Sequence, residues 1–515
     1  MAAGAAGLTL SFNAGVSDQV YTEALVAPVG PSLLSPLLSP TDPVAEVVGA
    51  LTAPGLMRAS PGGGPRLGLA TSWQRLDRGS RYRFTLSPKN RWSDGAPVTT
   101  KDVAFTLAVL QSAHFPNAAL AAPWSGVSLY ASSLWAGTFV LPGPSANFAA
   151  AAEDGLLPAA FYGAGVGRYF QDGRRTTAQF PPSAGPFRVM SNSPDQVALR
   201  RNAYYRPRPH LEGFDLALAP GATAVDQLLA KGAVDGWLAS TPSDLTGLPQ
   251  GLVRSRITTY DFVELLMNEQ APPLQDVSVR RALARAVDRA ELLRDQLAGL
   301  GEPQYGPLPD SISWAASAVY RPAGGGTVSS LLKGAGWSLS PKSHLWEKGG
   351  EPLSLTLDVP RLAPLPQAAA GVAAQLQRQG FLATVRLLPS SGFVSGTLSD
   401  EHFQLALVGF DNGPDPDLTS LFGSGVEPGQ SLDFSQGPPD LYLNHALDAL
   451  ATAATAAAQR GAYVEVVQRL RLDLPAVFLY TPVDFYVHVS SVHVPGAATR
   501  GDPTERFRDV YSWSL

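Results

Sequence analysis

The stretch from 82 to 110, YRFTLSPKNRWSDGAPVTTKDVAFTLAVL, carries several local structural signals in succession. Tyr82, Phe84 and Leu86 alternate with polar residues, which is the period-2 pattern of a half-buried strand. Residues 93–95, Ser-Asp-Gly, follow with turn chemistry, because an Asp side chain can bond its own backbone and Gly can adopt a positive φ. The stretch therefore predicts a strand and then a reversal of the chain.

A helix is expected directly after this turn. Thr99 or Thr100 can cap its start, and Asp102 lies in its first turn, where the helix dipole favours a negative charge. One face of the helix is apolar at helical spacing and consists of Val103, Leu107 and Leu110. Strand, turn and helix thus follow one another without a conflicting signal.

The composition limits the kind of protein that this chain can form. With 515 residues, 45% of them hydrophobic and 16% charged, it has the composition of a soluble globular protein. This length is too great for one ordinary core, so two or three lobes are expected. The formal net charge of -5, without a dense basic run, argues against a nucleic-acid partner.

Some features are excluded by what the chain lacks. It contains no cysteine, which excludes disulfides, thiolate metal sites, a cysteine nucleophile and a lipidated N-terminal cysteine. No apolar run reaches the roughly 18 to 20 residues needed to span a bilayer. Residues 1–15 lack the basic region of a complete signal peptide. We expect them to be a disordered lead-in or the remnant of a removed signal or anchor.

The sequence WSDGAPVTTKDV at 92–103 resembles a known family signature, W-S-D-G-x-P-V-T-x-x-D-V. It is the signature of the family-5 extracellular solute-binding proteins, the oligopeptide- and dipeptide-binding receptors of ABC importers. Within this stretch, Trp92, Asp94 and Asp102 are interpreted as structural residues, because each can make a local turn or cap.

The resemblance extends over almost the whole chain, from about residue 20 to residue 515. Gly185-Pro186-Phe187 matches the start of a pair of family strands, and PPLQDVSVRRALARAVDR at 272–289 matches the family pattern at the start of a second lobe. The apolar spacing of this second stretch predicts one helix from 278 to 298. The ending RFRDVYSWSL, at 506–515, matches the closing segment of the family.

The resemblance implies an α/β protein with a two-lobed, periplasmic-binding-protein-like type II fold and an extra subdomain inserted in the first lobe. Strands and helices alternate in the second half of the chain, as this class requires. Lobe I is expected to be discontinuous, because the C-terminal strand and closing segment resemble elements that return to it. The expected division is a lead-in at 1–15, lobe I at 16–45, 183–258 and 485–515, the inserted subdomain at 46–182 and lobe II at 259–484.

The resemblance also implies a ligand site between the lobes. Its expected residues are Ser32, Leu33, Asn268, Trp314, Gly409, Phe410, Asp411, Asn412 and Asp415. In peptide-binding relatives the loop that corresponds to 409–417 brings a carboxylate to the α-ammonium of the ligand, because a desolvated ammonium requires an anion and hydrogen bonds. Here Asn412 stands where the clamping Asp of the family usually stands. We expect Asp411, one place earlier, to reach the cleft instead, and we interpret Asp415 and Asp417 as caps of the following helix.

The chain lacks the motifs of the common catalytic sites. GFVSG at 392–396 has the wrong spacing for G-x-S-x-G, H-E-x-x-H is absent, and GGGPRLGLATS at 62–72 lacks the Lys of a Walker loop. His488 and His493 are an odd number of residues apart on a predicted strand, so they point to opposite faces and no shared metal is expected. We therefore expect no catalytic residue, no metal, no cofactor and no enzyme activity.

The expected function is that of an extracytoplasmic receptor, in the periplasm or on the outer face of the cell membrane. It would close two lobes on a peptide and hand it to an ABC permease in the membrane. We expect a monomer without a nucleic-acid partner. Two alternatives stay open: the same fold binding an oligosaccharide, a metal chelate or an antibiotic, and a sensor or chaperone that does not transport.

Overall fold

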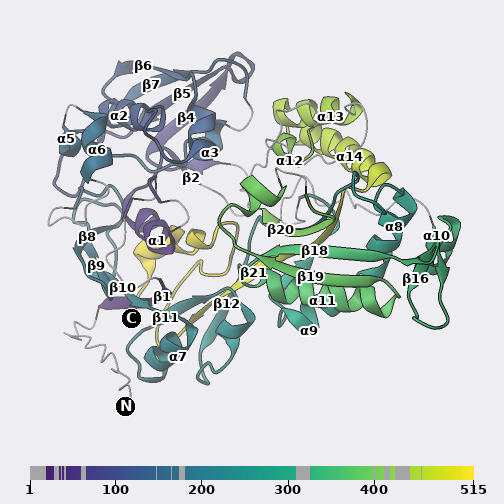
Figure 1. Cartoon of the computed structure of the whole chain (residues 1–515). Helices are drawn as coiled ribbons and strands as arrows, with labels where there is room; N and C mark the ends of the chain where they lie inside the picture. The colour runs from purple at the N-terminus through teal and green to yellow at the C-terminus, as the bar shows by residue number, and fades with distance from the viewer. Residues whose placement is uncertain are drawn as a thin grey trace.

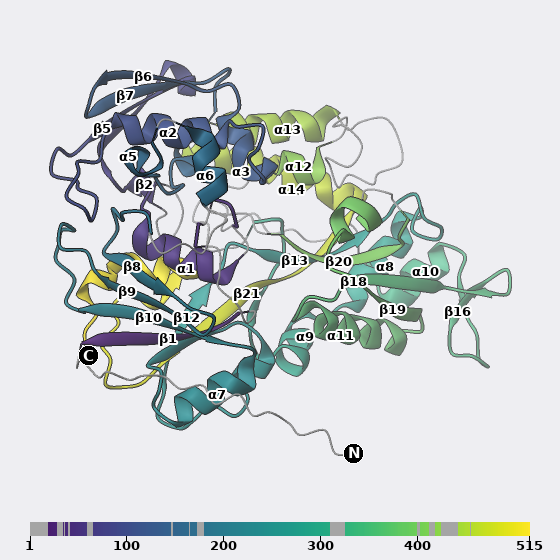
Figure 2. The ribbon, with the colours of Figure 1, turned by 60° about the vertical axis from the view of Figure 1, so that its left-hand side comes forward.

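The structure is a computed structural model of the whole chain. It describes residues 19–27, 34–35, 37–39, 42–58, 65–145, 148–163, 165–172, 180–308, 325–398, 402–410, 418–423, 441–453 and 455–515. Two lobes lie side by side, and a smaller subdomain packs on the first of them (Figure 1). The turned view in Figure 2 shows the same division.

Lobe I is built on one half of a large mixed sheet. Its elements are β1 (Val20–Val26), α1 (Pro43–Thr52), β8 (Phe187–Asn192), β9 (Gln196–Arg201), β10 (Gly213–Ala219), α7 (Ala222–Ala230), β11 (Gly236–Ala239), the 3₁₀ turn η3 (Pro242–Leu245), β12 (Val253–Thr258), β22 (Thr499–Arg500) and the 3₁₀ helix η5 (Pro503–Ser512). The Tyr21 ring of β1 lies 5.0 Å from the Phe214 ring and 5.4 Å from the Trp513 ring. The C-terminal residues therefore pack in the core of the same lobe as the first strand.

The subdomain holds a separate four-stranded sheet. Its elements are β2 (Met57–Arg58), β3 (Arg66–Leu67), β4 (Ala70–Leu76), η1 (Asp77–Gly79), β5 (Arg81–Leu86), α2 (Thr100–Leu110), α3 (Ala118–Ala121), η2 (Ala122–Trp124), β6 (Ser128–Ser133), β7 (Ala136–Val140), α4 (Phe148–Ala151), α5 (Ala159–Tyr162) and α6 (Val166–Asp172). The antiparallel order β4-β5-β7-β6 places β5 inside the sheet.

The strand, turn and helix predicted from residues 82–110 are confirmed. The Asp94 carboxylate accepts a hydrogen bond from the Ala96 N–H at 2.9 Å, and Gly95 has a φ of +90°. The Thr99 side chain caps α2, and the Asp102 carboxylate in turn accepts the Thr99 N–H at 2.7 Å. Asp94 and Asp102 thus make the local turn and cap expected of structural residues.

Lobe II covers its part of the large sheet with helices on both faces. Its elements are β13 (Phe262–Met267), α8 (Val277–Ala286), α9 (Arg289–Gln296), β14 (Gly301–Pro303), α10 (Val328–Gly334), β15 (Ser338–Leu339), β16 (Trp346–Lys348), β17 (Glu351–Pro352), β18 (Ser354–Pro360), α11 (Leu365–Arg378), β19 (Leu382–Leu388), the π-helix η4 (Phe393–Leu398), β20 (Leu405–Phe410), α12 (Thr419–Phe422), α13 (Leu441–Thr452) and α14 (Ala456–Asp473). Helices α9 and α11 lie on one face of the sheet, and α12 to α14 lie on the other (Figure 1).

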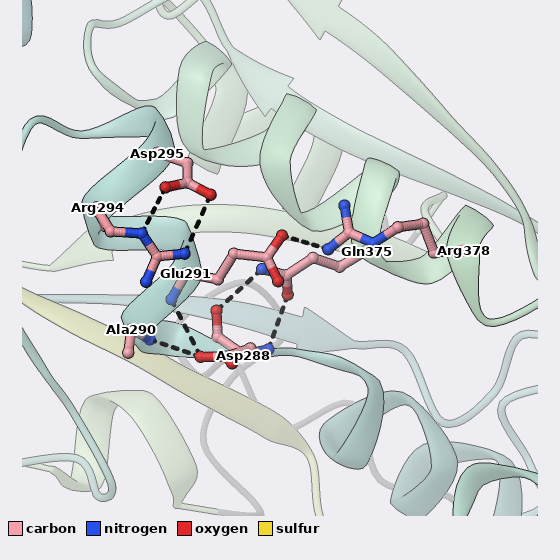
Figure 3. Close-up of polar contacts among 7 residues, drawn as sticks. All are labelled: Asp288, Ala290, Glu291, Arg294, Asp295, Gln375 and Arg378. Atoms are coloured by element: carbon pink, nitrogen blue, oxygen red, sulfur yellow. Dashed lines mark hydrogen bonds and ion pairs between the residues drawn. The ribbon is translucent and has the colours of Figure 1, made fainter.

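The prediction of one helix from 278 to 298 is wrong, because the chain breaks between α8 and α9. The Asp288 carboxylate accepts hydrogen bonds from the N–H groups of Ala290 and Glu291, at 2.9 and 3.0 Å, and so caps α9. The Gln375 side chain of α11 bonds both the N–H and the C=O of Asp288 (Figure 3). A side chain distant in the sequence therefore satisfies the backbone groups that the break leaves open.

One strand joins the two halves of the large sheet. β21 (Ala476–His488) pairs with β13 near its start and with β11 and β12 near its end. The sheet therefore runs through both lobes in the order β19-β18-β20-β13-β21-β11-β1-β10-β9-β8. Residues 259–261, between β12 and β13, form a further connection between the lobes.

The packing of α1 bears on the expected division of the chain. The insert is expected to begin at residue 46, which divides this helix. Its apolar residues pack in the lobe I core and include Val44, Val47, Val48 and Leu51. We propose that the insert begins after Thr52, so that α1 belongs wholly to lobe I.

Candidate ligand-binding site

The chain passes between the lobes at two places in its described part. The first crossing is residues 259–261, and the second is residues 481–483 of β21. The Thr259 N–H and hydroxyl both donate to the Pro482 carbonyl at 3.2 Å, so the crossings lie against each other. Pro482 has no N–H to donate. The sheet therefore has one hydrogen bond fewer where a change of lobe angle would bend it.

The C-terminal segment braces the first crossing. The Gly501 N–H donates to the Thr258 carbonyl at 2.8 Å, and Gly501 has a φ of +120°. A Cβ atom at this position would lie 2.9 Å from the Tyr260 ring, which is itself buried. Glycine is therefore required at 501 by both its backbone conformation and the close approach of Tyr260.

Two of the expected site residues lie at the lobe II end of the first crossing. Gly409 and Phe410 end β20 and pair with Val263 and Phe262, the first two residues after the crossing region. The rings of Phe410 and Phe262 lie 5.5 Å apart. Gly409 is exposed and Phe410 is half-buried. Their contact with a ligand stays a prediction.

Asn268 lies at the opposite end of β13 from the crossing. Since each residue of a strand spans about 3.3 Å, the six residues of β13 separate Asn268 from the crossing by roughly 20 Å. Asn268 is buried, its amide donates to the Phe403 carbonyl at 3.0 Å, and its side-chain oxygen accepts the Gln270 N–H at 2.9 Å. These contacts brace a turn of lobe II, and a ligand contact of Asn268 stays a prediction.

The other expected site residues lie outside the described part of the chain. They are Ser32, Leu33, Trp314, Asp411, Asn412 and Asp415. Asp417, interpreted as a helix cap, also lies outside it.

A cavity of about 460 Å³ lies beside the first crossing. Its described lining comes mainly from four distant parts of the chain: residues 46–58 around α1, residues 153–155 of the subdomain, residues 259–261 and residues 502–508 around η5. Its volume falls within the range of about 300 to 1,000 Å³ typical of small-molecule sites. Because the crossing forms part of its wall, an occupant would contact a segment that connects the two lobes.

A family described as bacterial extracellular solute-binding proteins, family 5 Middle, matches residues 64–429. The chain belongs to this family. The resemblance seen at 92–103 and along the chain is thereby confirmed.

Individual relatives agree with this assignment. Protein XP55 of Streptomyces lividans is 28% identical over 292 residues, an alignment that spans 55% of this chain and only 52% of XP55. The oligopeptide-binding protein AppA of Bacillus subtilis is 24% identical over 439 residues, which cover 81% of this chain and 78% of AppA.

Solved structures establish the fold of this family-5 protein. AppA of Bacillus subtilis, in complex with a nonapeptide, has a TM-score of 0.73 at 20% identity and covers 97% of this chain and 99% of its own. NikA from Brucella suis, in complex with Fe(III)-EDTA, has a TM-score of 0.79 at 18% identity, with coverage of 96% and 100%. The predicted α/β, two-lobed fold of the periplasmic-binding-protein type is confirmed.

Two carboxyl groups in the cavity of this family-5 protein have strongly shifted pKa values. Burial raises the pKa of Asp154 to about 7, although the Trp124 indole N–H donates to it at 3.1 Å. Burial and the nearby charge of Asp502 raise the pKa of Glu505 to about 7, against the opposing effect of Arg508. The charge of the cavity therefore changes near neutral pH.

Sequence reasoning missed the residues that line this cavity. Asp154 lies in a subdomain segment with few sequence signals, and Glu505 directly precedes the RFRDVYSWSL ending. The ending itself was informative only through its resemblance to the family. Nothing in the sequence indicates that Asp154 and Glu505 lie beside the same cavity as Tyr260. The three residues are distant in the sequence and come together only in the folded protein.

The described residues offer neither a metal centre nor a membrane span. They contain no group of three or more His, Asp or Glu that could hold a metal ion. His488 is buried with its Nδ1 3.0 Å from the Val489 carbonyl, whereas His493 pairs through its backbone with Ser514. None of the described helices is long and apolar enough to cross a membrane.

Proposed function

We propose that this family-5 protein is the substrate-binding protein of an ABC importer, which binds a peptide between its lobes and delivers it to a membrane permease. The observation that carries the proposal is a cavity of about 460 Å³ whose wall includes the first chain crossing. The oligopeptide-binding AppA, whose fold this chain shares and whose structure holds a nonapeptide, supports a peptide as the ligand.

The mechanism follows from the two crossings. A ligand that contacts both lobes binds the closed state better than the open one, and so it shifts the population toward closure. Moving the equilibrium from 1:99 to 99:1 requires about 10⁴-fold tighter binding to the closed state. Gly409 and Phe410 would meet the ligand from lobe II, and the walls of the cavity would meet it from lobe I.

The protein would act as a monomeric receptor outside the cytoplasm, without a catalytic step and without nucleic acid. The family name, which describes extracellular solute-binding proteins, supports this location. The permease would recognise the closed receptor, because closure is the change that reports an occupied site.

A non-peptide ligand is the second candidate. It is favoured by Asn412, which stands where the family usually places its clamping Asp. NikA, which holds Fe(III)-EDTA, shows that the same fold accepts a ligand that is not a peptide.

Native mass spectrometry of the purified protein tests the proposal. A peptide released on denaturation and rebound on addition would support a peptide receptor, and a co-purified chelate or sugar would support the second candidate. Small-angle scattering should show a smaller radius of gyration with ligand, since closure brings the lobes together. An unchanged radius on saturation would contradict the closure mechanism.

A second experiment tests whether Asp411 contacts the α-ammonium of the retained peptide. If Asp411 holds the peptide ammonium, Asp411→Ala should weaken binding by about 2 to 5 kcal/mol, the range for leaving a buried charge unpaired. Acetylation of the peptide should remove the difference between Asp411→Ala and wild type in titration calorimetry. Equal affinities of wild type, Asp411→Ala and Asn412→Ala would show that this loop does not hold the ligand.

A further inference from the structure

We propose that the cavity beside the first crossing selects peptides with a positively charged side chain, and that Asp154 and Glu505 determine this preference. The inference rests on the proposed peptide-binding function and specifies the class of peptide. The preferred group is the ammonium of a Lys or the guanidinium of an Arg residue of the ligand.

The walls of the cavity are rich in carboxyl groups. Among the described lining residues there are six carboxyl groups and two guanidinium groups. The carboxyl groups come from every side: Glu46 from α1, Glu153 and Asp154 from the subdomain, Asp261 from the first crossing, and Asp502 and Glu505 from the C-terminal segment. Carboxyl groups thus outnumber guanidinium groups by six to two among the described lining residues.

The two guanidinium groups of the cavity walls, on Arg58 and Arg508, do not compensate both shifted carboxyl groups. Arg58 and Arg508 both act on Glu505, whereas Asp154 receives only the indole N–H of Trp124 among the described interactions that affect its titration. Arg508 also shares its charge with Asp509, whose carboxylate lies 3.4 Å from its Nε. Asp154 is thus left without a compensating cation in the described structure.

Ionised Asp154 and Glu505 carry an electrostatic cost in the protein without ligand. The pKa values of Asp154 and Glu505 stand at about 7, so the protein's own cations do not stabilise both charges fully. A cationic group inside the cavity would supply the missing charge and form charge-assisted hydrogen bonds. An anionic side chain would instead add repulsion and a desolvation cost. The same cavity therefore favours one peptide class and disfavours another.

The preference for cationic peptides should also depend on pH. A cation binds better to the ionised carboxylates than to the neutral acids. Because both pKa values of the free protein are about 7, the carboxylates become ionised as the pH rises from 6 to 8. The preference for cationic peptides should therefore be stronger at pH 8 than at pH 6.

The test offers a mixed library of peptides of three to nine residues to the wild-type protein, with native mass spectrometry to identify those retained. Peptides that contain Lys or Arg should be enriched at least fivefold over those that contain Asp or Glu at pH 8, and less at pH 6. Asp154→Asn with Glu505→Gln should reduce the enrichment to below twofold. Both replacements keep the size of the side chain, and the amide oxygen introduced by Asp154→Asn can still accept the Trp124 N–H.

A matched control is Glu351→Gln, which removes an exposed carboxylate from strand β17 of lobe II. It should keep the full enrichment of the wild type. Retention of no peptide by the wild type would overturn the proposed function itself. Retention without charge preference, or a preference that persists in the double variant, would overturn only the inference. If the double variant failed to fold, the wild type alone would still test the inference, because the comparison of pH 6 with pH 8 needs no variant. A lower enrichment of cationic peptides at pH 8 than at pH 6 would overturn the inference.

Discussion

Two glutamates occupy similar strands in the two lobes but have opposite surroundings. Glu23 lies in β1 of lobe I and Glu264 lies in β13 of lobe II, and each has an exposed fraction of 0%. The Glu23 carboxylate accepts hydrogen bonds from Arg506 at 2.5 Å and from the Tyr486 hydroxyl at 2.7 Å. In the described structure, neither carboxyl oxygen of Glu264 has a hydrogen-bond partner.

The difference shows how burial acts on a charge with and without a partner. Arg506 is also buried, so Glu23 and Arg506 form an ion pair that ties the C-terminal segment to the first strand. Burial alone raises the pKa of Glu264 well above its ordinary value. An isolated buried carboxylate is so costly that the group becomes neutral instead. Lobe I therefore depends on its buried Glu, whereas lobe II carries one that weakens it.

The largest expected effect comes from breaking the pair in lobe I. Arg506→Met should lower the free energy of unfolding of lobe I by about 3 to 5 kcal/mol, because it leaves Glu23 buried without a compensating charge. Urea unfolding followed by tryptophan fluorescence measures the change. Adding Glu23→Gln should recover part of the loss, since the unpaired charge is then gone. A loss below about 1 kcal/mol in the single variant would contradict the role given to the pair.

The opposite sign is expected in lobe II. Glu264→Met replaces an unpartnered carboxyl with an apolar side chain of similar size and should raise the free energy of unfolding by about 1 to 3 kcal/mol. Leu266→Met, in the same strand and also buried, is the matched control and should cost less than about 1.5 kcal/mol. Destabilisation by Glu264→Met would mean that the carboxyl has a stabilising role.

The pH dependence sharpens the comparison further. Because the pKa of Glu264 is higher in the folded than in the unfolded protein, the folded state holds more protons between these two values. The contribution of Glu264 to the free energy of unfolding should therefore be most favourable below about pH 4.5. It should fall as the pH rises, by up to about 1.4 kcal/mol per pH unit. Glu264→Gln should remove this slope from urea midpoints measured at several pH values. An identical slope in wild type and variant would show that Glu264 does not titrate as proposed.

The smallest effect is expected from an ion pair on the surface. Arg256 of β12 and Glu302 of β14 lie 2.7 Å apart across the edge where the two lobes meet, and both side chains are more than 40% exposed. Since solvent and salt screen such pairs, Arg256→Met should change the free energy of unfolding by only about 0.2 to 1 kcal/mol. A loss of unfolding free energy as large as that expected for Arg506→Met would show that the exposed pair stabilises the protein as much as the buried pair of Glu23 and Arg506.

Local features of the fold were predictable from the sequence. The turn at Asp94 and Gly95 and the cap at Thr99 depend on atoms only a few residues apart, so the sequence pattern contains the whole interaction. The break at Asp288 was missed for the opposite reason. It depends partly on Gln375, which is 87 residues away and becomes its neighbour only in the folded lobe.

The candidate site was predictable only in part. The resemblance to the family pointed to Gly409 and Phe410, which lie at the junction of the lobes. It also pointed to Asn268, whose amide is engaged in a turn of lobe II. The acidic cavity had no sequence signal, because its walls come mainly from four distant parts of the chain, from residues 46–58 to residues 502–508.

By itself, the sequence determined the family, the two-lobed α/β class and the strand, turn and helix of residues 82–110, because periodicity, caps and turns act over a few residues. Only the tertiary structure decided which buried charge is paired. VYTEALV and FVELLM look alike, each an apolar strand with a Glu inside. The fold brings Arg506 to Glu23 across 483 positions and brings no partner to Glu264 within the described chain. The physical reason is that the energy of a buried charge depends on its neighbours in space, which the sequence around it does not specify.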